Sequence, residues 1–398
     1  MTKTIYEEIT AKQTLNRVKE KKMPFDWSIN PYRGCAHGCS FCYARAFQSF
    51  IGMGAQDEFQ HHIFIKNNAV EALEAQLAVI AGKFCHDIEA VRRHIGQVTI
   101  GTATDPYQPV ESKTEITREC LKLLAKYRIS TSITTRSPLV LRDLDILTRM
   151  DQVSVNISIN TMDNNVIHKL EPASPHPAKR METVQRLSQH GIRTRIFAAP
   201  VLPFLTDREE QMNQLLYAAK EAGADFAMIS LLRLSRDVKE WYMQTLRHQF
   251  PEVVSLYAKL YSGSAYAEDS YVTSFKDLAQ KLLMKYDLTG MSSGPGGRAS
   301  NQFGPIAENE APWAVSAIKT GEDQLSKAGE GQRSGSSLSV LEKPGDFETL
   351  CENSYNKNTA CSAPTPTEVK RKGKLPVPSS PVEQEELMPE IEQLSFPF

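Results

Sequence analysis

The sequence of 398 residues has no long apolar run, because no segment approaches the roughly eighteen residues that a membrane-spanning helix needs. Its N-terminal stretch, MTKTIYEEITAKQTLNRVKEKKM, is too polar for a secretory signal peptide. An excess of one charge is also missing, since 46 basic and 47 acidic residues give a formal net charge of −1. A strongly basic footprint for nucleic acid is therefore absent, and charge leaves the choice of partner open. We expect a cytoplasmic protein that does not enter a membrane.

Cysteine is scarce, and its seven positions are too irregular for a disulfide framework. Three of the cysteines, Cys35, Cys39 and Cys42, lie within eight residues of one another, whereas the other four are scattered. This distribution predicts a reducing compartment and one site built from thiolates.

The composition changes after Gly290. The segment 295–398 holds 11 of the 22 prolines together with stretches rich in Ser and Gly. From residue 291 onward there are 10 basic and 15 acidic residues, a net charge of −5, which leaves a net +4 before it. Such composition is typical of disorder. We predict a polar, partly helical lead-in, a folded domain and a low-complexity, disordered C-terminal tail, at residues 1–26, 27–289 and 290–398.

Strand patterns alternate with helical patterns of ten to fifteen residues through the middle of the chain, which predicts βαβ units and a parallel sheet. Together with the segment that precedes them, about six units fit a partial (β/α)6 TIM-type barrel better than a closed eight-fold one. Functional residues in such folds lie at the C-terminal ends of the strands. The expected strands are 97–104, 128–135, 152–160, 192–200 and 225–232, and the expected helices are 67–81, 114–127, 139–150, 178–190, 207–222, 236–261 and 274–286.

Residues 30–45, NPYRGCAHGCSFCYAR, carry the most informative motif. Three cysteines separated by three and then two residues, in a loop with Gly34 and Gly38, can surround one inorganic cluster. Thiolates select soft metals and hold iron–sulfur clusters. Three protein ligands leave one iron of a four-iron cluster open, whereas a structural zinc site needs a fourth ligand nearby. His37 is the candidate for that fourth ligand, but its place between two cysteines is awkward for a tetrahedral site, and we interpret it as a loop-packing residue.

The cysteine spacing, with the aromatic Phe41 before the last cysteine, resembles the signature of the radical SAM superfamily, and the wider string is similar to the branch that contains spore photoproduct lyase. The resemblance implies a partial barrel over about residues 25–265 and a [4Fe–4S] cluster on Cys35, Cys39 and Cys42, with S-adenosylmethionine (SAM) on the open iron. It also implies an enzyme that takes one electron from a flavodoxin- or ferredoxin-type donor. SAM cleavage would then give a 5′-deoxyadenosyl radical that abstracts hydrogen from an unidentified substrate.

Candidate SAM contacts follow from the same resemblance. Oxygens of Thr104 and Asp105 are placed to receive the SAM amine, and Arg136 to pair with the carboxylate through charge-assisted bonds. The photoproduct lyases have a serine, a lysine and a serine where this chain has Thr104, Arg136 and Ser158, and the arginine keeps the positive charge. Tyr43 is a further candidate. The alternative is that these residues make only local bonds at strand ends.

Several other residues have structural interpretations. Residues 107–111 (YQPVE) resemble a family segment that either orients its loop or faces the substrate. Residues 170–172 (LEP) with Arg180 also resemble a family signature after the fourth strand, and the alternative, which we favour, is a salt-bridged loop of Glu171 and Arg180. Pro200 is read as a turn residue and Asp207 as a helix cap.

The substrate is not given by these motifs. Repair of DNA photoproducts is one possibility, but the lyases carry a hydrogen-donating cysteine where this sequence has Thr102, and a threonine O–H bond is too strong for that role. We therefore predict a different reaction, on nucleic acid or a peptide, inside an apolar barrel interior. A non-catalytic, metal-binding interaction module that uses the cysteine loop is the other alternative.

Overall fold

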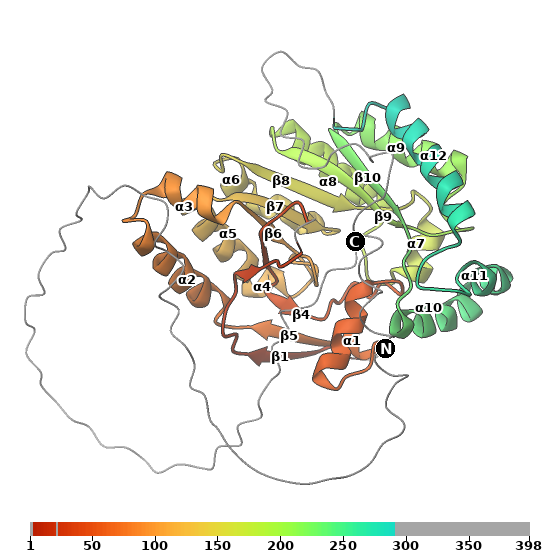
Figure 1. The fold of residues 1–398 in the computed structure, drawn as a ribbon, viewed down its shortest axis with the longest axis horizontal. Coiled ribbons are helices and arrows are strands. Elements are labelled where there is room, and N and C mark those ends of the chain that lie inside the picture. The colour runs from red at the N-terminus through yellow and green to blue at the C-terminus, as the bar shows by residue number, and fades with distance from the viewer. Residues whose placement is uncertain (1–2, 21–22, 291–398) are drawn as a thin grey trace, which may run out of the picture. The chain divides into compact units, whose positions relative to one another are not determined.

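A seven-stranded sheet forms the centre of the protein in the computed structural model, which describes residues 3–20 and 23–290 (Figure 1). Its strand order is β10-β9-β8-β7-β6-β3-β2, and every neighbouring pair is parallel except β2 with β3. The six parallel strands confirm the predicted partial TIM-type barrel. The strands are β2 (Asn16–Arg17), β3 (Trp27–Ile29), β6 (Gln97–Ile100), β7 (Ser130–Thr135), β8 (Val153–Ser158), β9 (Arg193–Val201) and β10 (Phe226–Leu231).

Helices connect successive parallel strands, as expected for βαβ units. Contacts join α8 to β8 and β9, and α12 to β10 and α9 (Figure 1). None of the helices in the described ranges is both long and apolar enough to span a bilayer. The helices are α1 (Glu58–His61), α2 (Ala69–Lys83), α3 (Ile88–Ile95), α4 (Glu111–Thr114), α5 (Ile116–Lys126), α6 (Leu144–Leu147), α7 (Asn164–Leu170), α8 (Pro177–Gln189), α9 (Glu209–Glu221), α10 (Arg236–Gln249), α11 (Val254–Leu260) and α12 (Asp269–Lys285), with 3-10 turns η1 (Tyr43–Ile51), η2 (Pro138–Asp143) and η3 (Pro251–Val253).

The two faces of the large sheet differ in polarity. Ile100, Ile133 and Val155 are fully buried and belong to one apolar core with the helices that pack on their face. Because side chains alternate along a strand, the residues between them point to the opposite, inner face. One register row there consists of Ser28, Thr99, Ser132 and Ser154. The inner face of β6, β7 and β8 is therefore more polar than the predicted apolar interior, whereas Phe197 of β9 and Phe226 and Met228 of β10 place apolar side chains on that face.

A second, three-stranded sheet was not expected from the sequence. It has the order β1-β5-β4, with β1 at Ile5–Ile9, β5 at His62–Lys66 and β4 at Tyr32–Arg33. The predicted helical character of the N-terminal segment is wrong, because β1 and β2 are strands. Most β1 side chains are exposed, so backbone pairing with β5 rather than burial forms this strand.

Several local expectations also differ from the structure. The long helix expected at 236–261 is interrupted at Pro251, which has no backbone N–H to continue it. Asp207 does not cap a helix, because its carboxylate accepts a hydrogen bond from the Tyr271 hydroxyl, and α9 begins at Glu209. Pro200 lies inside β9 and not in a turn.

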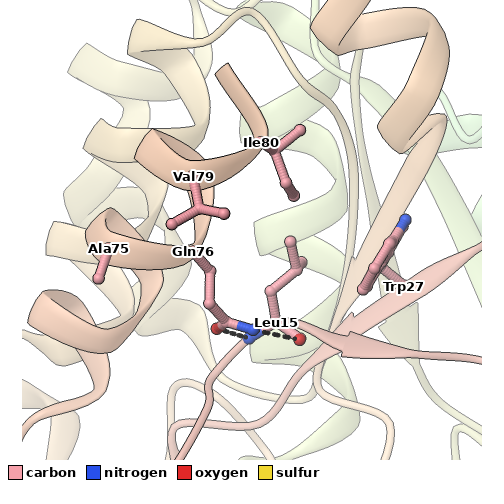
Figure 2. A pocket seen from close by; sticks show the side chains of 6 residues that line it. All are labelled: Leu15, Trp27, Ala75, Gln76, Val79 and Ile80. Carbon is pink, nitrogen blue, oxygen red and sulfur yellow. Dashed lines mark hydrogen bonds between the residues drawn. The ribbon is translucent and has the colours of Figure 1, made fainter. Parts of the chain in front are cut away.

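An apolar pocket of about 320 Å³ lies between α2 and the N-terminal segment (Figure 2). Gln76 is its polar member: its Oε1 accepts the backbone N–H groups of Thr14 and Leu15, and its Nε2 donates to the Leu15 carbonyl, each at 2.9 Å. This side chain therefore attaches the N-terminal segment to α2. The pocket is lined by Leu15, Trp27, Ala75, Gln76, Val79 and Ile80.

We expect Gln76→Ala to lower the free energy of unfolding by about 2 kcal/mol, because it leaves backbone groups of the N-terminal segment without partners. Urea denaturation followed by circular dichroism measures this change. Val79→Ala, on the same helix and 62% exposed, is the control and should change stability by no more than about 0.5 kcal/mol. Equal effects of the two substitutions would contradict the assignment.

Candidate functional site

The three motif cysteines lie in a tight loop between β4 and η1. Gly34 and Gly38 have φ angles of 78° and 68°, which side chains rarely allow. A Cβ on Gly34 would also lie 2.7 Å from the carbonyl oxygen of His62, so the backbone approaches β5 too closely for any larger residue. Cys35 and Cys39 are buried, Cys42 is partly buried, and no disulfide involves them.

Arg45 supports this loop from inside the protein and is fully buried. Its guanidinium donates to the carbonyl oxygens of Cys39 at 2.7 Å and of Gly38 at 2.9 Å. The same group donates to the carbonyls of Ala55 and Gln56 and to the Gln60 side chain, and it stacks between the rings of Phe59 and Trp241. Arg45 is the last residue of the motif, and its structural role could not be predicted from the sequence.

Residues that follow β6 hold the other side of the loop. The Thr104 hydroxyl donates to the Gly34 carbonyl at 2.6 Å, and Gln108 Nε2 donates to the Thr104 hydroxyl at 3.2 Å. Gln108 Oε1 accepts the Ala36 N–H at 3.0 Å. Of the two interpretations of residues 107–111, the structure therefore supports the one in which they orient a loop.

Asp105 joins the cysteine loop to the end of β7. Its carboxylate accepts hydrogen bonds from the Thr135 hydroxyl at 2.6 Å and from the Arg136 N–H at 2.8 Å, and it lies 3.3 Å from His37 Nδ1. Burial alone would raise the pKa of Asp105, but His37 and these hydrogen bonds lower it to about 2. His37 Nδ1 also lies 3.6 Å from Cys35 Sγ, so His37 packs within the loop as predicted.

Arg136 follows β7 at this edge of the sheet. Its Nε lies 3.3 Å from Glu171 Oε2, and the same oxygen accepts from Arg180 Nη2 at 2.6 Å. Burial would raise the pKa of Glu171, but Arg180 and Arg136 lower it. The salt-bridged loop is confirmed. Arg180 also donates to the Ser158 carbonyl at 3.1 Å, which fixes the end of β8 beside Arg136.

The positive charge of Arg136 acts on the thiol of Cys39. Burial raises the pKa of Cys39 to about 12, while the Arg136 guanidinium opposes the shift. Cys35 and Cys42 act on each other electrostatically, and burial raises the pKa of Cys35 as well. Thiolates of Cys35 and Cys39 therefore require a strong positive partner, such as metal ions, to be stable.

The thiols of the three motif cysteines are the candidate metal ligands of this site. Within residues 3–20 and 23–290, no three His, Cys, Asp or Glu side chains converge as they would around one metal ion. His37 is engaged with Asp105 in this arrangement. Thiols are the donors that iron–sulfur clusters take, so the chemistry of the three motif cysteines fits such a cluster.

Tyr43 and Thr102 connect the loop to the end of β6. The Tyr43 hydroxyl donates to the Thr102 carbonyl, and the Thr102 hydroxyl accepts from Asn30 Nδ2 at 2.9 Å. Tyr43, like Thr104 and Asp105, thus has a structural contact in addition to its candidate role toward SAM. Ser158 is 7% exposed, and its hydroxyl lies on the inner face one row from Asn156.

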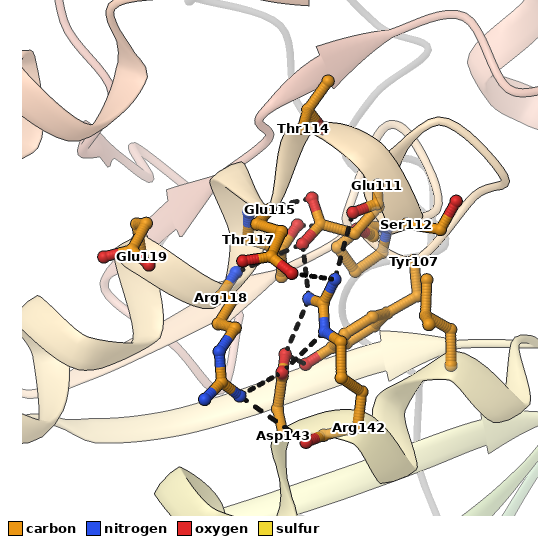
Figure 3. A network of polar contacts seen from close by, with 12 residues as sticks. Tyr107, Glu111, Ser112, Thr114, Glu115, Thr117, Arg118, Glu119, Arg142 and Asp143 are labelled. Atoms are coloured by element: carbon orange, nitrogen blue, oxygen red, sulfur yellow. Dashed lines mark hydrogen bonds and ion pairs between the residues drawn. The ribbon is translucent and has the colours of Figure 1, made fainter.

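A buried ionic network below the loop was missed by sequence reasoning (Figure 3). Glu111 accepts hydrogen bonds from Tyr32, at the start of the motif, and from Arg142 Nη2 at 2.7 Å. Asp143 accepts from Arg118 at 2.7 Å and from the Tyr107 hydroxyl at 2.9 Å. The six side chains are scattered from residue 32 to 143, and only the fold brings their opposite charges together.

Comparison with known proteins identifies the family. The model of the radical SAM superfamily matches residues 29–216. The protein Rv2578c of Mycobacterium tuberculosis is 30% identical over 289 residues, which cover 72% of this chain and 82% of that protein. The chain belongs to the radical SAM superfamily. This radical SAM enzyme is also 27% identical to MJ0683 of Methanocaldococcus jannaschii over 278 residues, or 69% of this chain and 95% of that protein.

The structural comparison supports the same fold. A mutant spore photoproduct lyase with bound AdoMet and dinucleoside spore photoproduct superposes with a TM-score of 0.52 at 16% identity, covering 71% of this chain and 79% of the lyase. At that identity the likeness concerns the fold alone. Membership of the radical SAM superfamily implies SAM and an iron–sulfur cluster as cofactors.

We expect Arg45→Lys to lower the free energy of unfolding by about 3 kcal/mol, because one ammonium group cannot replace a forked guanidinium at five hydrogen bonds. Urea denaturation measures the loss, and iron content after anaerobic reconstitution should fall with it. Arg92→Lys, which changes an exposed pair with Glu89, is the matched control and should stay within about 0.5 kcal/mol of the parent. A stable, fully loaded Arg45→Lys protein would contradict this role.

Proposed function

We propose that this radical SAM enzyme holds a [4Fe–4S] cluster on Cys35, Cys39 and Cys42, with SAM bound at the iron that has no protein ligand. When bound, this cofactor pair supplies a 5′-deoxyadenosyl radical that abstracts hydrogen from a substrate C–H bond. One observation carries the proposal: the three-cysteine loop is tied by buried hydrogen bonds to the C-terminal ends of β6 and β7, beside Arg136. A flavodoxin- or ferredoxin-type protein is the electron donor in this proposal.

The chain's own residues have defined tasks in this scheme. Arg136, whose side chain is 17% exposed, binds the SAM carboxylate, and Glu171 orients it. The hydroxyl of Ser158, at the end of the neighbouring strand β8, contacts SAM. Oxygens of Thr104 and Asp105, near the loop, receive the SAM amine. Burial of the surrounding side chains excludes water from the reacting atoms.

The proposed reaction is not repair of a thymine photoproduct. Thr102 stands where the lyases have the hydrogen-donating cysteine, and its hydroxyl is already bonded to Asn30. Among the described residues, the two cysteines outside the motif do not replace it. Cys120 is buried in the core on α5, and Cys85 is exposed in the connection between α2 and α3.

Anaerobic reconstitution with iron and sulfide tests the proposal. We expect a brown protein with about four irons per chain that forms 5′-deoxyadenosine from SAM under dithionite. Cys39→Ala should lose the iron and the cleavage, whereas Cys85→Ser, at an exposed cysteine outside the motif, should keep both. A colourless protein that binds one zinc would favour the non-catalytic module and overturn the proposal.

Arg136→Ala is expected to assemble its cluster but to bind SAM roughly tenfold to a hundredfold more weakly, because a charge-assisted bond to the carboxylate is lost. Equilibrium dialysis with labelled SAM, alongside iron analysis, measures the two properties separately. Arg149→Ala, at an exposed arginine after α6, is the control and should leave both unchanged. Unaltered SAM affinity in Arg136→Ala would remove this residue from the site.

A further inference from the structure

The inner face of the large sheet carries hydrogen-bonding groups below the level assigned to SAM. Thr134, Asn156 and Arg195 form one register row across β7, β8 and β9, and Phe226 of β10 continues it. The neighbouring outward residues Ile133, Val155 and Ile196 are fully buried against the helices. The row therefore faces the interior of the partial barrel.

Asn156 has an acceptor without a partner at this position. Its Nδ2 donates to the hydroxyls of Ser132 at 2.9 Å and Thr134 at 3.2 Å, which fixes the orientation of the amide. Its Oδ1 is buried and has no hydrogen-bond partner among the described residues, and the side chain is only 2% exposed. A buried acceptor of this kind costs about 1–3 kcal/mol unless a donor reaches it.

The same feature recurs two residues after the end of β8. Asn160 Nδ2 donates to the Pro200 carbonyl at 3.1 Å, and its Oδ1 also lacks a partner within the described part of the chain. In both side chains the amide N–H groups donate to protein oxygens, and the Oδ1 atom is left to accept a hydrogen bond from a ligand. The inner side of β8 is consequently suited to a ligand that donates hydrogen bonds.

Arg195 places a positive charge next to Asn156. The two residues are register neighbours on adjacent parallel strands, and the Arg195 guanidinium lies 6.0 Å from the centre of the Phe226 ring. The Arg195 side chain is partly exposed on this face. Burial lowers its pKa more than Asp225, the acidic group that acts on it, raises it. An anion at this position would stabilise the guanidinium further.

The row of Thr134, Asn156 and Arg195 lies close enough to the proposed SAM contacts to hold a substrate. Asn156 precedes Ser158 by two residues, so the two side chains are about 7 Å apart along the same face of β8. A group bound at Asn156 and Arg195 is therefore adjacent to a SAM molecule that contacts Ser158 and Arg136. Hydrogen transfer needs the reacting atoms about 3–3.5 Å apart, so a substrate held at this row must extend toward Ser158 to meet SAM.

We propose that Asn156 and Arg195 form the floor of the substrate site and bind an anionic group, carboxylate or phosphate, that carries a nearby N–H donor. This inference rests on the proposed function, because it places the substrate beside SAM. Arg195 binds the anion, and Asn156 Oδ1 accepts the N–H. A purely apolar substrate would leave Asn156 Oδ1 without a donor.

Binding of small probes tests this site without requiring turnover. The reconstituted, SAM-loaded protein is titrated anaerobically by calorimetry with N-acetylglycine for the carboxylate arm and thymidine 5′-monophosphate for the phosphate arm. Acetate and inorganic phosphate are the matching anions without an N–H group. We expect at least one N–H-bearing probe to bind more tightly than its matching anion, and the arm that binds identifies the anion.

Substitutions then assign the contacts. Arg195→Gln should weaken the bound probe about tenfold or more, whereas Arg193→Gln, two residues earlier on β9 and exposed, should have no effect. Asn156→Leu, which keeps the shape but removes the acceptor, should abolish the preference for the N–H-bearing probe. If Asn156→Leu does not fold, the two arginine variants still decide the question.

Two outcomes overturn the inference: no probe binds the parent protein more tightly than its matching anion, or Arg195→Gln binds as tightly as the parent. Formation of 5′-deoxyadenosine without substrate is measured on the same samples. If the protein cleaves SAM but binds no probe, only the assignment of Asn156 and Arg195 to the substrate site is contradicted. Absent SAM cleavage in a reconstituted protein contradicts the proposed function, whatever the probes do.

Discussion

The contact on which the site depends is the hydrogen bonding of the cysteine loop to buried polar side chains. A loop with two glycines at positive φ has little conformational preference of its own, so its shape must come from its surroundings. Arg45 binds the loop carbonyls from one side, and Thr104 and Gln108 bind the backbone from the other. Without these bonds, three neighbouring thiolates would have no fixed spacing to offer a rigid inorganic cluster.

Burying so many charged groups is unfavourable unless each one has a partner, and the structure arranges them in pairs. Asp105 lies against His37, and Glu171 against Arg136 and Arg180. Each carboxylate has a pKa below its usual range, so both stay ionised while buried. Glu171 also holds the Arg136 guanidinium in place, which would reduce the entropy lost when the proposed SAM carboxylate binds there.

Much of the fold was predictable because it depends on local patterns. The alternation of β-branched and amphipathic segments gave six parallel strands, and the cysteine spacing indicated the family. The small sheet was not predictable, because the side chains of β1 are mostly exposed and its pairing with β5 joins segments more than fifty residues apart. Arg45 carried a signal, its fixed place in the motif, but its five bonds depend on where Ala55 and Gln60 fold.

The inner face shows a more general limit of reading strands one at a time. The segments 152–160 and 192–200 contain both apolar and polar residues, and periodicity separates them into two faces without saying which face meets the helices. Register decides it: Ile133, Val155 and Ile196 fall into the core, which leaves Thr134, Asn156 and Arg195 together on the other side. A parallel sheet buried on both faces normally has apolar residues on each. The polar row on the inner face of β7, β8 and β9 is therefore a departure from this pattern, and a bound polar ligand would account for it.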